Sequence, residues 1–124
     1  RAAAVMEDVL GRVDAFWLLW DRVIADPANF RRLVELCLKN RVALIAPATT
    51  FVEAGALLSV GANYRAAGKR AGEMARLVVE RKARAGEFRA EAPRETVLTI
   101  NLQVAGRLGI TFPRTLRAEF LSPP

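Results

Sequence analysis

Short apolar runs alternate along the chain with segments that carry helix-start signals, and this alternation constrains the fold more than any other feature. A run that is apolar throughout is typical of a strand covered on both faces, as in a parallel sheet. Strands that alternate with helices predict an α/β fold, with a mainly parallel sheet flanked by helices. The predicted strands cover residues 14–20, 42–48, 56–61 and 96–100.

The helices between these runs are marked by their ends. Asp26 followed by Pro27 supplies an N-cap and a first-turn proline, and this helix ends near Asn40. Asn101 can cap a short helix that Gly109 closes. The predicted helices cover residues 2–12, 27–40, 64–85 and 102–109, and a last short helical segment follows Pro113.

One glycine-rich stretch superficially suggests a phosphate-binding loop. Such a loop has four residues between its first glycine and its Gly-Lys pair, and a Ser or Thr follows the lysine. Here six residues separate Gly61 from Gly68, and Arg70 follows Lys69. Gly68 and Lys69 are therefore expected inside the helix, where their amides are already bonded. We interpret Gly68 and Gly72 as flat spots that let this helix approach the sheet.

The sequence offers few of the residue types that enzymes use for catalysis. Histidine is absent, which removes histidine-based nucleophile pairs and metal sites. Glu53 has no carboxylate at plausible paired spacing except Glu73 on another element. The single cysteine, Cys37, lies among apolar helix positions and is expected to be a buried thiol. We therefore predict no enzyme activity, no catalytic or metal-binding residue and no cofactor.

The charge pattern and the lengths of the apolar runs argue against two kinds of partner, nucleic acid and the interior of a membrane. The net charge is +6, but acidic residues are interspersed with the basic ones and no aromatic residues alternate with them, which argues against nucleic-acid binding. No apolar run approaches the roughly 20 residues that span a bilayer. The first residues carry no leader pattern, so a signal peptide is either absent or already removed.

Two stretches carry a resemblance to a known family. They are "FVEAGALLSVGANYRAAGKRAGEMARLVV" (51–79) and "TINLQVAGRLGITFP" (99–113). They resemble the C-terminal portion of the substrate-binding proteins of ABC-type importers, the branch with a type I periplasmic-binding-protein fold. The resemblance covers roughly residues 13–116 without an insertion. In the second stretch the matching positions are Ala105, Leu108, Gly109, Ile110 and Pro113.

The resemblance implies a division into two lobes. Proteins of this family have two Rossmann-like lobes in about 300 residues, so this chain resembles a fragment that lacks most of the first lobe. Residues 1–54 are then expected to be part of the second, C-terminal lobe. Residues 55–124 are expected to form a hinge crossing and the segment that completes the first lobe. A second crossing is considered near residues 86–95.

The ligand site is expected where strands end. In open α/β sheets ligands bind beyond the carboxyl ends of strands, and in a two-lobed binder they lie between the lobes. In the family an Asp commonly stands where Asp21 is, and a second Asp where Ala48 is, so the first matches and the second does not. The candidate ligand-binding residues are Trp20, Asp21, Ala48, Thr49, Thr50, Gly61 and Tyr64.

Several of these residues also have a structural interpretation. Asp21 could end the strand or cap a turn. Trp20 could belong to the core, and Tyr64 could be a packing residue at a helix start. Thr49 and Thr50 offer hydroxyls in place of the missing second carboxylate.

The resemblance implies a solute-binding component of an ABC-type importer, which captures a small organic ligand such as an amino acid between two lobes by hinge closure. It also implies a membrane permease as partner and a periplasmic or membrane-anchored extracytoplasmic location. The alternative is the ligand-sensing regulatory domain of a signalling protein, and a small α/β enzyme ranks third. A neighbouring permease gene would favour import, and a fused kinase would favour sensing.

Overall fold

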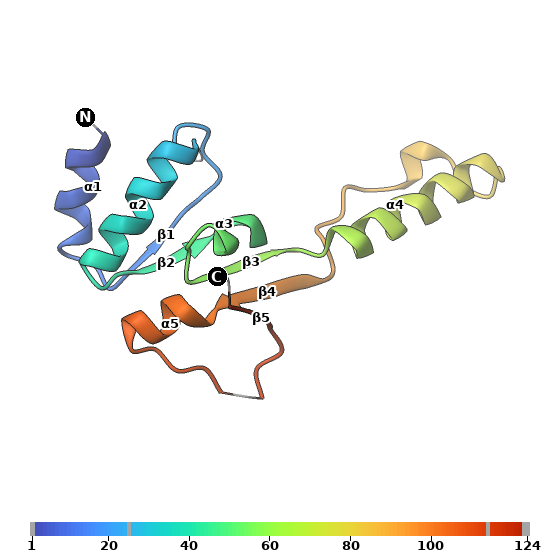
Figure 1. Ribbon diagram of the computed structural model, residues 1–124. Coiled ribbons are helices and arrows are strands. Elements are labelled where there is room, and N and C mark those ends of the chain that lie inside the picture. The colour runs from blue at the N-terminus through green and yellow to red at the C-terminus, as the bar shows by residue number, and fades with distance from the viewer. Residues whose placement is uncertain (1, 25, 114, 123–124) are drawn as a thin grey trace. The chain divides into compact units, whose positions relative to one another are not determined.

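A computed structural model describes residues 2–24, 26–113 and 115–122 of the chain (Figure 1). Within these residues, five strands form one sheet in the order β1-β2-β3-β4-β5. The strands are β1 (Ala15–Trp17), β2 (Ala43–Ala46), β3 (Leu58–Ala62), β4 (Thr96–Asn101) and β5 (Glu119–Leu121). The α-helices are α1 (Ala2–Leu10), α2 (Pro27–Lys39), α3 (Thr49–Glu53), α4 (Tyr64–Val79) and α5 (Leu102–Leu108), and a 3₁₀ turn, η1, covers Ala85–Glu87. The predicted α/β class is confirmed.

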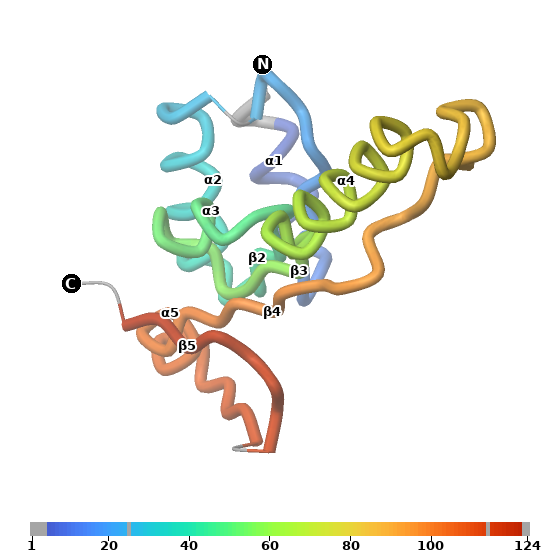
Figure 2. Tube along the Cα trace, turned by 90° about the vertical axis from the view of Figure 1, so that its right-hand side faces the viewer, coloured from blue at the N-terminus to red at the C-terminus, as the bar shows by residue number. Residues whose placement is uncertain are grey.

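The strand directions explain where the helices lie. β1 is parallel to β2, β2 to β3, and β4 to β5. Between β3 and β4, the Asn101 amide donates to the Leu57 carbonyl, and the Asn63 amide donates to the Glu95 carbonyl. These bonds set an antiparallel register. Because crossover connections are right-handed, the reversal places α5 on the opposite face of the sheet from α2 and α3, as Figure 2 shows.

Each face of the sheet has its own apolar cluster. The larger cluster joins α1, α2 and α3 to β2, and its buried members are Leu10, Leu18, Phe30, Leu33, Leu36, Cys37, Val42, Leu44, Ala46, Phe51, Val52 and Ala56. The smaller cluster is centred on α5 and contains Leu57, Val104 and Ala105. Alternate residues of β2 serve the two faces: Leu44 and Ala46 pack in the first cluster, and Ala43 packs against the second.

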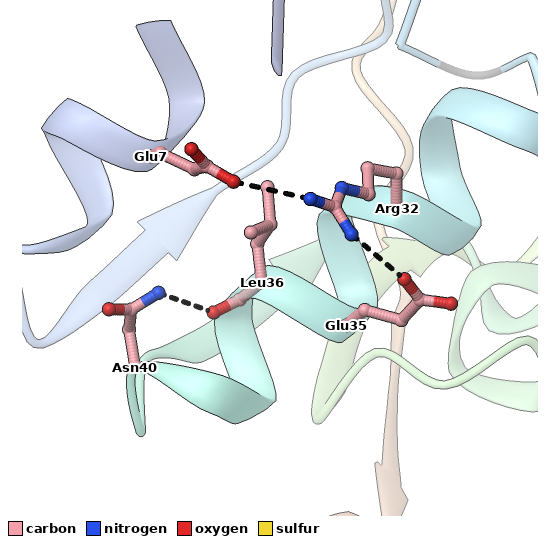
Figure 3. A network of polar contacts seen from close by, with 5 residues as sticks. All are labelled: Glu7, Arg32, Glu35, Leu36 and Asn40. Carbon is pink, nitrogen blue, oxygen red and sulfur yellow. Dashed lines mark hydrogen bonds and ion pairs between the residues drawn. The ribbon is translucent and has the colours of Figure 1, made fainter. Parts of the chain in front are cut away.

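Helix α1 packs beside α2, and an arginine on α2 links them (Figure 3). The Arg32 guanidinium lies 3.2 Å from the Glu7 carboxylate on α1 and 3.4 Å from Glu35 on its own helix. At the end of α2, the Asn40 side-chain amide donates to the Leu36 carbonyl at 2.8 Å. The ion pairs are solvent-exposed and contribute little to stability. Helix α1 is therefore held mainly by Leu10, which is buried in the core, and by the partly buried Met6, which packs against it.

The predicted caps are confirmed. The Asp26 carboxylate accepts from the amides of Ala28 and Asn29 at the start of α2. The Asn101 side chain accepts from the Val104 amide at 3.1 Å and opens α5. Gly109 closes α5 in the left-handed conformation, with φ of 72°. Local sequence alone was sufficient to place these helix ends.

Strand β1 is shorter and more exposed than predicted. The sequence suggested a strand over residues 14–20 that is buried on both faces, but only Ala15–Trp17 is a strand. β1 lies at one end of the strand order, and Trp17 is 69% exposed. An apolar run indicates burial on both faces only for an interior strand. Leu18, just after β1, is the residue of this run that is buried.

Three segments differ from the predicted elements. Residues 49–53, which lie between two predicted strands and were assigned to no helix, form α3. Helix α4 ends at Val79 instead of near residue 85, because Arg81 takes a left-handed φ of 55° and the amides of Arg81 and Lys82 turn back to the last turn. The prediction of a helical segment after Pro113 is wrong for residues 119–121, because these residues form β5 and pair with β4. Position 114 lies outside the described residues.

Residues 51–79 otherwise follow their predicted course. Gly68 and Lys69 lie inside α4, which confirms that they form no phosphate loop. β3 is an interior strand, with Leu57 buried and Leu58 half-buried, as expected. A Cβ at Gly68 or Gly72 would meet no atom within 4 Å among the described residues. The interpretation that these glycines let the helix approach the sheet stays a prediction.

The chain groups into two compact units by its internal contacts. The first contains residues 1–61 and 98–124, and the second contains residues 62–97. The chain leaves the first unit along β3 and returns along β4. The lobe assignment expected for residues 1–54 and 55–124 stays a prediction. Among the described residues, no helix is long and apolar enough to cross a lipid bilayer.

Candidate functional site

The candidate site is the edge of the first unit at which β1, β2 and β3 end. These strands are parallel neighbours, so their carboxyl ends meet at one edge of the sheet. Five of the seven predicted ligand-binding residues follow β1 or β2, and Gly61 is the second-to-last residue of β3. Tyr64 opens α4 in the second unit and is 79% exposed.

Trp20 lies after β1 and presents its ring to solvent. Its side chain is 70% exposed. Its indole meets the Phe51 ring of α3 edge to face, with centroids 5.6 Å apart and planes at 78°. Phe51 in turn packs against Phe30 in the core, 4.9 Å away. The core interpretation of Trp20 is therefore wrong in this structure, because the residue contacts the core through Phe51 but stays 70% exposed.

Asp21 caps a turn after β1, as its structural interpretation predicted. Its Oδ1 accepts from the amides of Val23 at 2.9 Å and Ile24 at 3.1 Å. The side chain is exposed, and no bond from the described residues reaches Oδ2. One carboxylate oxygen therefore orders the loop after β1, and the negative charge of the group stays available to a ligand.

The loop between β2 and α3 carries the next three residues. Ala48 is half-buried, extended at φ −152°, and precedes the first turn of α3. Thr49 begins the helix, and its hydroxyl lies 2.9 Å from that of Thr99 on β4. Thr50, the next residue, is exposed. The two threonines thus have different surroundings, because one hydroxyl is fixed by the protein and the other faces solvent.

Gly61 allows the end of β3 to lie close to the backbone that follows β2. A Cβ built at Gly61 would lie 3.2 Å from the carbonyl oxygen of Pro47, just before Ala48. Contacts of that length are tighter than side chains normally make, so the absence of a side chain permits this approach. Together with the Trp20–Phe51 contact, it brings the loops after β1 and β2 and the end of β3 into one neighbourhood.

Two residues that support this edge from β4 were missed by the sequence analysis. Thr99 and Asn101 on β4 are buried and hold α3, since Thr99 bonds Thr49 and the Asn101 side-chain amide donates to the Val52 carbonyl at 3.0 Å. Ser59 on β3 is also fully buried. The sequence shows these residues as polar positions within apolar strands. Which face of the sheet they share is known only from the way the strands pair.

The described part of the chain shows no cluster of metal-ligating residues, and its one cysteine is a weak nucleophile. No group of three or more His, Cys, Asp or Glu residues is close enough there to hold a metal ion. Burial raises the pKa of the Cys37 thiol from 9.0 to about 11, so it stays protonated at neutral pH. Cys37 is buried in the core, as predicted.

The second unit has a cavity of its own, of about 460 Å³, between α4 and residues 89–95. Its rim carries an ion network in which Glu91 lies 2.9 Å from Arg70 and 3.0 Å from Arg94. The hydrogen bond from Arg70 is the largest cause of a lowered pKa at Glu91. A bond from the Asn63 side chain to Glu95 at 3.2 Å adds a second tie. These contacts hold the returning segment against α4.

Similarity to known proteins supports the same fold. The family model described as ABC transporter substrate binding protein matches residues 2–120. A search of curated proteins finds no significant match.

Three solved structures are similar to the chain. A ligand-free, open substrate-binding protein with adhesive properties from Clostridium difficile has a TM-score of 0.83 at 20% identity, over 99% of this chain and 41% of that one. A conserved domain protein from Vibrio cholerae has a TM-score of 0.70 at 22% identity, over 95% and 40%. A protein from Streptococcus pneumoniae in complex with L-Trp has a TM-score of 0.72 at 26% identity, over 96% and 40%.

The chain spans about 40% of the length of each of these structures. The family model, by contrast, matches almost all of the chain. The mostly parallel sheet and the cluster of strand ends agree with that match, and the chain belongs to the ABC transporter substrate-binding protein family.

Proposed function

We propose that this chain is part of the solute-binding component of an ABC importer, and that the component captures a small organic ligand. The observation that carries the proposal is the meeting of Trp20, Asp21, Thr49 and Gly61 at one sheet edge, in a chain that belongs to a substrate-binding family. Ligands of open α/β folds bind beyond this edge.

The residues at the edge suit an amino acid. The exposed Trp20 ring offers a flat surface for an apolar or aromatic side chain. The Asp21 carboxylate can accept from an ammonium group, and the hydroxyls of Thr49 and Thr50 can donate to a carboxylate. The relative from Streptococcus pneumoniae was solved with L-Trp, which supports aromatic amino acids as the first ligands to test.

Hinge closure is the proposed mechanism. Ligand contacts made to both lobes of the whole protein stabilise its closed form, which delivers the ligand to a membrane permease. The two passages of the chain between its compact units, along β3 and β4, support this proposal. The returning passage, at residues 97–98, lies after the range 86–95 that was considered for a second crossing. Such a role places the protein outside the cytoplasmic membrane and requires no turnover of the ligand.

Calorimetry with a panel of L-amino acids tests the proposal. We expect a longer protein that contains this chain and both lobes to bind at least one of them, and the 124-residue chain to bind it weakly or not at all. Equal affinity of the two would contradict the two-lobed mechanism. Failure of the longer protein to bind any member of the panel would contradict an amino-acid ligand, and product formation from a bound ligand would contradict a non-catalytic role.

A further inference from the structure

The strongest unassigned feature is a hydroxyl pair behind the candidate site. The Oγ1 atoms of Thr49 and Thr99 lie 2.9 Å apart. Thr49 begins α3 at the carboxyl end of β2 and is half-buried, whereas Thr99 on β4 is 0% exposed. Because solvent does not reach Thr99, water cannot replace its bond to Thr49. The pair therefore fixes the Thr49 side chain from the interior.

A second bond from β4 holds the other end of the same helix. The Asn101 side-chain amide donates to the Val52 carbonyl at 3.0 Å. Thr99 and Asn101 are two residues apart, so they share one face of β4. A helix of five residues has little stability of its own. β4 thus determines how α3 is set against the sheet and where Thr49 lies at the strand edge.

Ser59 on β3 carries a buried hydroxyl that makes no hydrogen bond to α3. In the antiparallel register of β3 and β4, Ser59 lies opposite Thr99. Ser59 is also 0% exposed, but its Oγ has no hydrogen-bond partner among the described residues. Ser59 therefore matches Thr99 in burial and environment and differs from it in lacking a bond to α3.

We propose that Thr99 is a positioning residue for ligand binding, which orients the Thr49 hydroxyl toward a carboxylate oxygen of the ligand. The inference rests on the proposed function. When Thr99 donates to Thr49, the Thr49 hydroxyl hydrogen is left to donate outward, and a chain of hydrogen bonds in one direction strengthens each member. Thr99 does not touch the ligand, and its effect passes through Thr49.

The test measures affinity for L-tryptophan and the other L-amino acids by calorimetry, in the longer protein that contains this chain. Thr99→Val removes the hydroxyl at nearly constant volume and is expected to weaken binding by about three- to tenfold, the value of one hydrogen bond. Thr99→Ser keeps the hydroxyl and should retain affinity within about twofold. Ser59→Ala, the matched control on the same face, should leave affinity unchanged.

A double-mutant cycle separates positioning from general support of the fold. In a Thr49→Val background, Thr99→Val should have no further effect on affinity, because the hydroxyl that it orients is gone. Equal losses in both backgrounds would overturn the inference, as would unchanged affinity in Thr99→Val. If Thr99→Val does not fold, Thr99→Ala takes its place in the cycle. A wild-type protein that binds no amino acid overturns the proposed function itself.

Discussion

The rings of Trp20 and Phe51 meet in a T-shaped contact, with centroids 5.6 Å apart, while Trp20 stays 70% exposed. Phe51 is buried and belongs to α3, the helix that carries Thr49. The contact therefore fixes an accessible aromatic surface beside a fixed hydroxyl.

Trp20→Ala should weaken ligand binding more than it weakens the fold. The loss of a stacking surface is expected to reduce affinity by about tenfold, and the midpoint of thermal unfolding should change little because most of the ring is exposed. Trp20→Phe keeps a flat ring and is the control. Calorimetry and thermal unfolding of both variants check this, and an unchanged affinity in Trp20→Ala would remove the residue from the site.

Two substitutions at Asp21 separate its role in ordering the turn from its proposed role in binding a ligand. Asp21→Asn keeps an Oδ1 acceptor for the amides of Val23 and Ile24 but removes the charge. Asp21→Ala removes both.

If the carboxylate binds a ligand ammonium, both variants should lose at least about tenfold in affinity, since charge-assisted bonds are worth about 1.5–3 kcal/mol. If Asp21 only orders the turn, Asp21→Asn should bind like the wild type. Calorimetry on both variants distinguishes these results.

Two glycine substitutions should change stability in opposite directions. Gly61→Ala places a Cβ 3.2 Å from the Pro47 carbonyl oxygen and should destabilise the chain by about 1 kcal/mol. Gly68→Ala in α4 meets nothing within 4 Å and should stabilise the helix by about 0.5–1 kcal/mol. Urea unfolding of the 124-residue chain measures both. A stabilising Gly61→Ala would show that the strand end is not closely packed.

The Glu91 network predicts a dependence on pH. The hydrogen bond from Arg70, followed by the charges of Arg70 and Arg94, lowers the Glu91 pKa from its ordinary 4.5. A carboxylate with a lowered pKa in the folded state stabilises that state above its unfolded pKa. The contribution is therefore present above about pH 4.5 and is lost as the pH falls through the lowered value.

Carboxyl NMR titration should show Glu91 titrating below 4.5, and Arg70→Gln should raise its pKa more than Arg94→Gln does. The stability difference between the wild type and Glu91→Gln should disappear at low pH. An equal effect of the two arginine variants would contradict the leading role of the Arg70 bond.

The sequence by itself determined the features that depend on neighbours in the chain. Asp26, Asn101 and Gly109 mark helix ends because a cap acts on amides or carbonyls one to four residues away. The spacing of Gly61, Gly68 and Lys69 excluded a phosphate loop for the same reason. The class of fold followed from the alternation of apolar runs with helices, and the candidate residues at the edge followed from the places where those runs end.

Only the tertiary structure decided the features that depend on which strand lies beside which. The apolar run at residues 14–20 looks interior, yet β1 lies at the end of the strand order and leaves Trp17 exposed. Residues 119–121 become a strand because β4 offers them a partner. The bond between Thr49 and Thr99 joins residues 50 positions apart. No local pattern encodes such a contact, because it arises when β4 reverses direction beside β3 and brings its polar face under α3.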